Sequence, residues 1–397
     1  MLLILFLSVF IFLGYLIFEN ITLNRHLRTI SLRICVTGTR GKSSVVRMLA
    51  AILREDGRKV LAKMTGSRAV YILPDGEEVA VRRRGLTSII EQKNLVKKAA
   101  HMNVACLIAE IMSIHPENHF TESRKILKPD IVVITNVRLD HTDAMGEHED
   151  DIAAVFALVI TKKSTVFIPE KENRPVFSTA VENDGGELIC VQEGLPGKID
   201  QKLNTRFFPE NISLVKSLCK HLEISQTNIL KGLNKVKPDT GEFKVWKSVS
   251  KETKKTFFLA NGFAVNDPES TFALISEINR GFPFASGQLT GVLSLRADRV
   301  DRTLQWIEAL KKGGIAYFKR LFVTGTHAGI VRRKLKNSPI MVLKHKEPEK
   351  VMDEIITDLS GCEGSENECV IFGFGNIQGT GTMLINYWKT IGEEYGC

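Results

Sequence analysis

The stretch "VTGTRGKSS" at residues 36–44 decides the fold. It follows a short apolar run at 33–38, which reads as a buried strand, and it opens a segment at 42–56 with apolar residues at helical spacing. Gly41-Lys42-Ser43 matches the end of the phosphate-binding pattern G-x-x-x-x-G-K-[ST], but Val36 stands where that pattern has its first glycine. A glycine loop between a strand and a helix attracts phosphate, because backbone N–H groups and the helix dipole both favour an anion there. The stretch therefore predicts a nucleotide-binding α/β domain whose phosphate loop differs from the G-x-x-x-x-G-K-[ST] pattern.

Composition sets wide bounds on the rest of the chain. Its 397 residues favour two domains, and its hydrophobic fraction of 44% is ordinary for a globular protein. The formal net charge of +9 favours anionic partners but does not choose among nucleotide, acidic substrate, acidic lipid and nucleic acid. The seven cysteines contain no C-x-x-C pair, so neither a zinc framework nor a disulfide scaffold is indicated. A reducing compartment is the simpler interpretation.

The first segment differs from the rest of the chain. Residues 1–18 carry no charge, and at ~1.5 Å per residue a helix of this length reaches ~27 Å, close to the hydrocarbon thickness of a bilayer. A cleaved signal peptide is the alternative, but it usually has a basic front and a small-residue cleavage site. Here the first basic residue is Arg25, and basic residues follow the span without preceding it. We expect a transmembrane helix at 1–19, a juxtamembrane linker at 20–30, and catalytic domains on the cytoplasmic side of the cell membrane.

Beyond this segment, short apolar runs alternate with helical patterns in two series. A charged linker with a proline and a glycine lies between them at 235–244. Ser88 and Glu91 form a capping-box pattern that opens a helix. The alternation predicts a doubly wound, mainly parallel sheet at 31–244 and a smaller α/β Rossmann-like domain at 245–397. In the first series, buried strands are predicted at 104–110, 130–137, 165–170 and 188–192, with a hairpin at 69–83.

Three groups of polar residues follow predicted strands. In the loop at 38–43, backbone N–H groups would face phosphates, Lys42 would neutralise them and the Ser43 hydroxyl would bind Mg²⁺. Glu110 ends the strand at 104–110, where a carboxylate can serve as a hard oxygen ligand. Asp140, His141 and Asp143 cluster after the next strand. An ordinary turn, a surface glutamate and a solvated polar loop are the respective alternatives. Ligands of doubly wound sheets gather at the carboxyl ends of strands.

These three signals in this order resemble the Mur ligases, together with folylpolyglutamate synthase. That family has a T-G-T-x-G-K-[ST] loop, a metal-binding glutamate at a strand end and a metal-binding histidine in N-x-x-x-D-H. Here the corresponding stretches are "TGTRGKSS", Glu110 and "NVRLDH". The resemblance implies Ser43, Glu110 and His141 as metal ligands, and Lys42 and His141 as catalytic residues. It implies ATP binding by Gly38, Thr39, Arg40, Gly41, Lys42, Ser43 and Ser44.

The resemblance continues to the end of the chain. Asn211 occupies the place of the family's adenine-contacting asparagine, and "NGFAVNDPEST" at 261–271 resembles the family's D-Y-A-H-N-P stretch. The stretches at 296–303 and 373–381 resemble loops of the C-terminal domain that face the ATP cleft. By the same resemblance, the expected further ATP-binding residues are Asn211, Lys244, Asn261 and Asp267, the expected catalytic arginine is Arg299, and the expected substrate residues are Arg296, Asp298, Arg302, Gly375 and Asn376.

Within the family the resemblance is closest to the B subunit of poly-γ-glutamate (capsule) synthase. It rests on the N-terminal span, the loop wording, "EQK" at 91–93, "ADRVDRT" and "GFGNIQG". It implies Mg²⁺ and ATP as cofactors, glutamate and its growing polymer as substrates, and two partners: a multi-span membrane subunit and an extracytoplasmic capsule subunit. Three departures are visible. Residues 153–159 lack the family's modified lysine, Lys244 replaces an arginine, and Asn261 replaces an aspartate.

The implied reaction is amide formation through an acyl phosphate, driven by ATP. Two alternatives share the loop: a folylpolyglutamate-type ligase, which has no reason for a membrane anchor, and a P-loop regulatory ATPase, which would usually lack "NVRLDH". A nucleic-acid-binding protein is disfavoured, because the basic residues are spread along the chain without interleaved aromatic residues.

Overall fold

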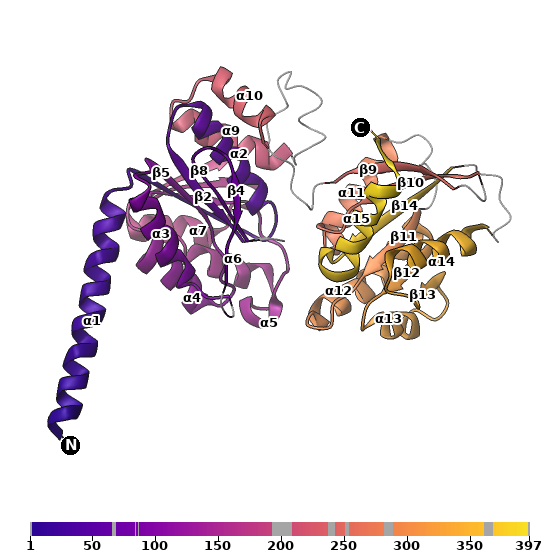
Figure 1. Ribbon diagram of the computed structural model, residues 1–397, viewed down its shortest axis with the longest axis horizontal. Coiled ribbons are helices and arrows are strands. Elements are labelled where there is room, and N and C mark those ends of the chain that lie inside the picture. Colours follow the sequence, from indigo (N-terminus) through magenta and orange to yellow (C-terminus); the bar gives the residue numbers. More distant parts are fainter. Residues whose placement is uncertain are drawn as a thin grey trace. The chain divides into compact units, whose positions relative to one another are not determined.

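The chain forms two compact units, Met1–Lys237 and Pro238–Cys397, in a computed structural model (Figure 1). The structure describes residues 2–65, 69–83, 85, 87–192, 209–236, 243–250, 254–281, 289–360 and 368–395. The sequence-based boundary at 244–245 stays a prediction, because residues 237–242 lie outside the described part of the chain.

The first unit is built on an eight-stranded sheet in the order β4-β3-β2-β5-β1-β6-β7-β8. Six strands are parallel, and β3 and β4 add an antiparallel hairpin at one edge. The predicted doubly wound sheet is thereby confirmed. The strands are β1 Leu32–Thr37, β2 Val60–Met64, β3 Val70–Ile72, β4 Glu78–Ala80, β5 Cys106–Glu110, β6 Ile131–Ile134, β7 Thr165–Pro169 and β8 Glu187–Val191.

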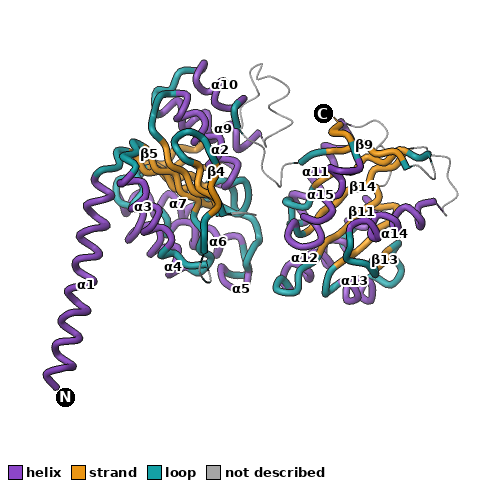
Figure 2. The backbone as a smooth tube through the Cα atoms, viewed as in Figure 1, coloured by secondary structure: helices purple, strands orange, loops and turns teal. Residues whose placement is uncertain are grey.

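Helices cover both faces of this sheet (Figure 2). Ile34 and Val36 of β1 pack into one hydrophobic cluster, and Cys35 between them packs into the other. Because both faces are covered, the central strands β5, β6 and β7 are mainly apolar. One cluster includes α2 Lys42–Glu55, α9 Pro209–His221 and α10 Gln226–Asn234. The other includes α3 Glu91–His101, the π-helix η1 Thr121–Leu127, α6 Glu149–Ala157 and α7 Pro175–Asp184. Shorter helical segments are α4 Pro116–Phe120, α5 Thr142–Met145 and η2 Glu170–Glu172.

The start of α3 corrects the predicted capping box. The Ser88 hydroxyl accepts a hydrogen bond from Ile90 N at 3.3 Å, outside the helix. The Glu91 carboxylate is bound by Lys63 and Arg83, so it does not cap the helix. Hydrogen bonds between ionised partners are stronger than neutral ones, so two cations outcompete a backbone N–H for this carboxylate.

The second unit has a seven-stranded sheet in the order β13-β12-β11-β14-β10-β9-β15. Its five parallel strands match the predicted second series, whereas the antiparallel strand β9 and the edge strand β15 that pairs with it were not predicted. The strands are β9 Val245–Val249, β10 Thr256–Asn261, β11 Leu289–Ser294, β12 Phe318–Thr324, β13 Ile340–Val342, β14 Glu368–Gly375 and β15 Glu393–Tyr395. The helices are α11 Pro268–Gly281, α12 Val300–Lys311, η4 Gly314–Tyr317, α13 Ala328–Lys334, α14 Pro348–Ser360, η5 Ile377–Gly381 and α15 Thr382–Ile391.

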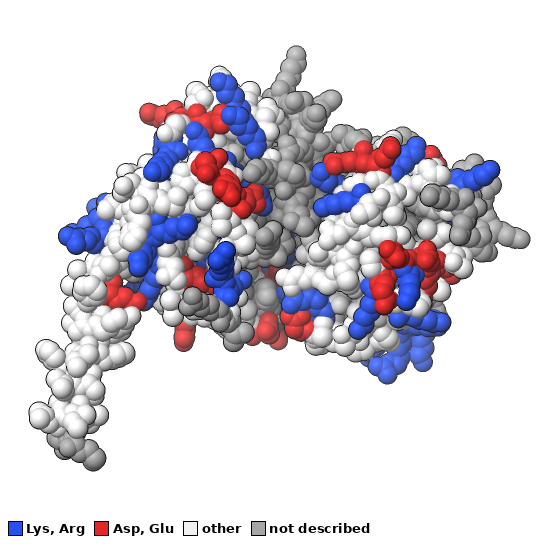
Figure 3. Space-filling model, viewed as in Figure 1, with Lys and Arg blue, Asp and Glu red and all other residues white. Residues whose placement is uncertain are grey.

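The first helix, α1 Leu2–Arg28, is long and apolar enough to cross a membrane by length and composition. Its outer part is exposed and carries no charged side chain, as its white surface in Figure 3 shows. Its last turns are part of the first unit, because Leu23 and Leu27 are buried in the same cluster as Leu95 of α3. Residues 20–28, predicted as linker, therefore continue the helix and pack against the sheet domain.

Candidate active site

Two glycines shape the loop between β1 and α2. Gly38 has a φ of +123°, and a Cβ there would come within 2.2 Å of the Thr135 hydroxyl oxygen. Gly41 caps α2 with a φ of +81°, and a Cβ there would come within 2.6 Å of the Asn211 amide nitrogen. Both positions combine a left-handed backbone with close contact, which only glycine tolerates. The second contact brings Asn211, from the start of α9, next to the loop.

The loop is bound to the segment that follows β6. Thr39 Oγ1 donates to Arg138 O at 3.1 Å and accepts from Arg138 N at 3.0 Å. Arg40 N donates to Asn136 Oδ1 at 2.9 Å, and the Arg40 guanidinium lies 3.5 Å from the Asp140 carboxylate. The structure therefore brings the predicted loop together with the "NVRLDH" segment.

Lys42 is folded back over its own loop. Its Nζ donates to Gly38 O at 2.6 Å and to Thr39 O at 3.2 Å. Burial lowers the pKa of Lys42, while the nearby Glu110 carboxylate acts in the opposite direction. The ammonium group thus sits at the loop where an anion would bind, held there by two carbonyl oxygens.

Ser43 and Glu110 meet at the carboxyl edge of the sheet. Ser43 Oγ donates to Glu110 Oε2 at 2.9 Å, and the same oxygen accepts from Thr65 N at 2.9 Å. Glu110 is buried at the end of β5. A hydroxyl and a carboxylate oxygen are the ligands that Mg²⁺ prefers, so this pair fits a divalent cation.

His141 is held by its neighbour Asp140. It has a φ of +47°, its backbone N donates to Asp140 Oδ1 at 2.9 Å, and its ring Nε2 lies 3.9 Å from that oxygen. Among the described residues, no group of three or more His, Cys, Asp or Glu side chains is arranged to hold a metal. The role of His141 as a metal ligand therefore stays a prediction.

A buried polar network lies directly behind Glu110. Lys63, fully buried in β2, donates to Glu91 at 3.0 Å and to Gln92 Oε1 at 3.3 Å. Gln92 Nε2 donates in turn to Glu110 O at 3.3 Å and to Glu122 Oε1 at 2.5 Å. In the sequence, "EQK" indicates only a family resemblance, and Glu122 was not predicted, because no local pattern links it to Gln92, which is 30 residues away.

Glu122 accepts hydrogen bonds from the backbone of the two residues at 112–113, shortly after Glu110. Its carboxylate accepts from Met112 N at 3.1 Å, from Ser113 N at 3.0 Å and from Ser113 Oγ at 2.6 Å. Burial raises the pKa of Glu122, while these donors and Gln92 oppose the shift. Ser113 Oγ also lies 3.1 Å from His119 Nδ1, and burial lowers the pKa of that histidine to about 3. The hydrogen-bond network next to Glu110 thus joins four elements: β2, α3, α4 and η1.

In the second unit, three predicted ATP-binding residues have structural roles of their own. Asn261 is buried at the end of β10, and its Oδ1 accepts from Phe263 N at 3.2 Å. Asp267 is buried, and its Oδ1 accepts from Ser270 N at 2.8 Å in the first turn of α11. Lys244 pairs with Glu394 of β15 at 2.6 Å.

The predicted substrate residues lie at the carboxyl ends of β11 and β14. Arg296 pairs with Asp298 at 2.5 Å, and the Asp298 pKa is lowered chiefly by the hydrogen bond from Arg296. Arg299 pairs with Asp301 at 3.2 Å. Arg302 is buried and donates to Gln305 at 2.7 Å.

The end of β14 turns sharply beside that of β11. Gly375 has a φ of +96°, and a Cβ there would come within 2.5 Å of Ser294 O. Asn376 N donates to Ser294 O at 2.9 Å, and its side chain accepts from Gln378 N at 2.9 Å. The structure therefore brings the two predicted glycine and arginine loops of the second unit to one sheet edge.

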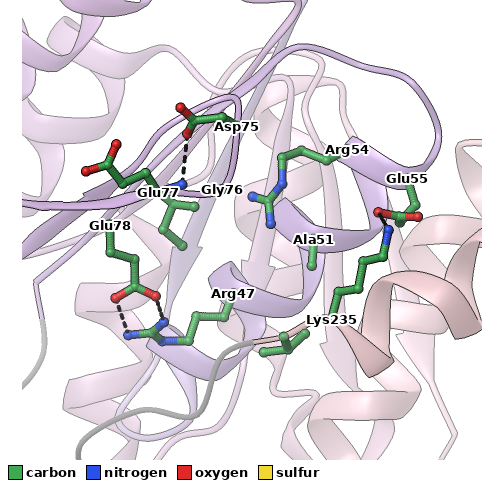
Figure 4. Close-up of a pocket in the computed structure, with 11 residues that line it drawn as sticks. Arg47, Ala51, Arg54, Glu55, Asp75, Gly76, Glu77, Glu78 and Lys235 are labelled. Carbon is green, nitrogen blue, oxygen red and sulfur yellow. Dashed lines mark hydrogen bonds and ion pairs between the residues drawn. The ribbon is translucent and has the colours of Figure 1, made fainter.

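A hollow of about 450 Å³ lies elsewhere, between α2 and the β3–β4 hairpin (Figure 4). Two ion pairs line it, Arg47 with Glu78 and Lys235 with Glu55. None of the predicted site residues lines it. We assign it no role in the reaction.

Each of the two units matches a known domain family. Residues 36–221 match the Mur ligase middle domain, and residues 246–391 match the poly-gamma-glutamate synthase CapB C-terminal domain. The chain is 27% identical to the capsule biosynthesis protein CapB of Bacillus anthracis over 384 residues, covering 94% of this chain and 79% of that protein. It is 28% identical to the PGA synthase CapB of Bacillus subtilis (strain 168) over 369 residues, covering 91% of each.

Solved structures share the fold at low identity. FolC of E. coli in complex with DHPP and ADP has a TM-score of 0.68 at 16% identity, covering 94% of this chain and 92% of that one. Folylpolyglutamate synthase of Mycobacterium tuberculosis, complexed with ADP and AMPPCP, has a TM-score of 0.68 at 15% identity, covering 94% and 95%. Residues 36–221 therefore form a domain of the Mur ligase middle-domain type and residues 246–391 a domain of the CapB C-terminal type, the domains of an ATP-dependent ligase.

Proposed function

We propose that this protein is an ATP-dependent ligase that polymerises glutamate through its γ-carboxylate. Two CapB relatives aligned over more than nine tenths of the chain support the substrate class. One structural observation carries the chemistry: the Ser43–Glu110 hydrogen bond of 2.9 Å, with the Lys42 ammonium held at the same loop. This arrangement suits the phosphates of a nucleotide and a divalent cation together.

The reaction needs activation because a carboxylate is a poor electrophile. Transfer of the γ-phosphoryl group of ATP to the γ-carboxylate of the chain end gives an acyl phosphate and ADP. The amine of the next glutamate attacks the acyl carbon, loses a proton and releases phosphate as the C–N bond forms. Lys42 neutralises charge on the transferring group, and the backbone N–H groups of the loop orient the phosphates.

Ser43 and Glu110 would hold Mg²⁺, which lowers the cost of charge on the phosphates. His141 is a further proposed metal ligand, and Asn211 is the proposed adenine contact. The arginines Arg296, Arg299 and Arg302, with Asp298, Gly375 and Asn376, are proposed to bind the anionic glutamate or the transferring phosphoryl group. Asn261, Asp267 and Lys244 are proposed to contribute to nucleotide binding from the second unit.

We also propose that α1 anchors the protein in the cell membrane, with both units in the cytoplasm. The uncharged outer part of the helix and the basic residues Arg25 and Arg28 behind it support this orientation. One helix cannot form a channel for a polyanion. A multi-span membrane subunit and an extracytoplasmic subunit are therefore the proposed partners, and co-purification from membranes tests for them.

The activity is tested with purified membranes containing the protein, Mg-ATP and labelled glutamate. We expect labelled polymer, with ADP and phosphate as co-products. Glutamate-dependent formation of AMP would contradict the acyl-phosphate route. Addition of glutamate only to a folate acceptor would favour the folylpolyglutamate-type alternative, and ATP hydrolysis that ignores glutamate would favour a regulatory ATPase.

A further inference from the structure

Helices α1 and α3 lie side by side and run in the same direction. Glu19 of α1 pairs with Lys93, in the first turn of α3, at 2.8 Å. Further along both helices, the rings of His26 and His101 pack edge to face with centroids 5.7 Å apart. Because the early residues of one helix contact the early residues of the other, and the late residues contact the late, the two helices are parallel.

The start of α3 marks the carboxyl edge of the first sheet. Gln92 donates to Glu110 O, at the carboxyl end of β5, and Glu91 reaches Lys63 near the end of β2. The far end of α3 lies at the opposite edge, because only residues 102–105 connect it to the first residue of β5. Helix α3 therefore runs from the carboxyl edge to the amino edge.

These two facts fix where the apolar part of α1 leaves the unit. Glu19 lies at the level of the carboxyl edge, beside the start of α3, and residues 2–18 continue beyond that edge (Figure 1). The phosphate loop, Glu110 and His141 belong to this same edge. The outer helix and the candidate site are therefore on one side of the sheet.

We propose that the headgroup layer of the bilayer lies against this carboxyl edge, next to α3, so that the active site is on the membrane-proximal side of the first unit. The inference rests on the membrane anchor of the proposed function. No flexible segment separates the span from the unit, since α1 is one continuous helix to Arg28 and its Leu23 and Leu27 are buried in the unit's core. The distance between the active site and the bilayer is thereby set by the fold.

The surface at the start of α3 has chemistry that suits this placement. Arg82 and Arg83 are exposed after the hairpin, with Arg83 paired to Glu91 at 2.7 Å, and Ile90, just before α3, is 59% exposed. Arginines with an adjacent exposed apolar side chain suit anionic headgroups and the boundary of the acyl chains. A polymer made at this edge would begin next to the membrane, within reach of a membrane-embedded exporter.

Tryptophan fluorescence in vesicles with brominated lipids tests the placement. The chain's own tryptophans, Trp246, Trp306 and Trp388, are all buried in the second unit, so they give a background that can be subtracted. In the full chain reconstituted in anionic vesicles, we expect brominated lipids to quench the added fluorescence of Ile90→Trp. The matched control Lys59→Trp, exposed just before β2 at the amino edge, should keep its fluorescence.

A second variant distinguishes the proposed placement of the carboxyl edge at the bilayer from nonspecific adsorption of the protein surface to lipid. Seven polar helix-forming residues inserted after Phe18 keep the helical phase and move the unit about 10 Å from the bilayer. Quenching of Trp at position 90 should then disappear, while glutamate polymerisation in detergent stays at the parental rate.

Each result decides the inference. Equal quenching at positions 90 and 59, or quenching that survives the insertion, overturns it. A chain that does not float with vesicles overturns it together with the anchor. Polymer synthesis in detergent without quenching at position 90 leaves the proposed ligase intact and removes only the membrane-facing placement.

Discussion

The carboxyl edges of the two sheets hold their polar side chains in different ways. In the first unit, Glu110 is buried and bound by Ser43 and Thr65 from other elements, above a network that reaches Lys63 and Glu122. In the second unit, Arg296 pairs with Asp298 only two residues away, at the surface. The first edge is therefore fixed by the fold, whereas the second is held partly by local pairs that a ligand can rearrange at small cost.

The largest expected effect comes from removing the centre of the buried network. Glu122→Ala leaves Ser113 and Met112 N–H groups and Gln92 without their acceptor, and we expect the free energy of unfolding to fall by about 3–5 kcal/mol. Urea unfolding of residues 20–397 measures it. The isosteric Glu122→Gln should lose less, because one acceptor oxygen remains. Equal small losses for both variants would show that the two edges are held alike.

Next is Lys42→Ala, which removes the cation of the phosphate loop. Loss of one charge-stabilising contact often costs on the order of 10²–10³-fold in rate, so polymer synthesis should fall by that factor while the protein stays membrane-bound. The matched control Lys59→Ala removes an exposed lysine at the opposite edge and should keep the parental rate. Wild-type polymer from Lys42→Ala would exclude the assigned loop.

The pH dependence of stability probes His119. Its pKa is about 3 in the folded protein, below its ordinary value of 6.5, because it is buried. The unfolded chain therefore binds more protons between these values, and the stability that His119 contributes is lost as pH falls below about 6, by up to about 1.4 kcal/mol per pH unit. His119→Gln should flatten this part of the profile in denaturant titrations at pH 6 and pH 5. A profile unchanged by the substitution would contradict this origin.

The smallest effect is expected from Asp298→Asn, which removes the ion pair of Arg296 with Asp298 at the surface of the second unit but keeps the hydrogen bond from Arg296 to Gln378. The free energy of unfolding should change by less than about 1 kcal/mol, as for most exposed ion pairs. If Arg296 binds glutamate, the KM for glutamate should change while that for ATP stays the same. A large loss of stability would mean that this edge, too, is fixed by the fold.

Much of the first edge was predictable because its signals are local. The phosphate loop, the strand ending at Glu110 and the segment with His141 are each a short run of residues with a recognisable pattern. The network behind them was not, because Lys63, Gln92 and Glu122 come from three elements and only the folded chain brings them together. Strands β9 and β15 were missed for another reason: β9 is exposed over part of its length and β15 at every residue, so neither shows a clear apolar pattern.

The contact between Gly38 and Thr135 has a consequence for how such sequences diverge. A side chain at 38 would collide with the hydroxyl oxygen and the backbone N of Thr135, at 2.2 and 2.9 Å. Replacement of Gly38 requires a change in its backbone conformation and also a shift of Thr135, the residue just before "NVRLDH". The glycine loop and the segment after β6 are almost a hundred residues apart in the sequence but in direct contact. We therefore expect substitutions at position 38 and at position 135 to occur together among distant relatives of this chain.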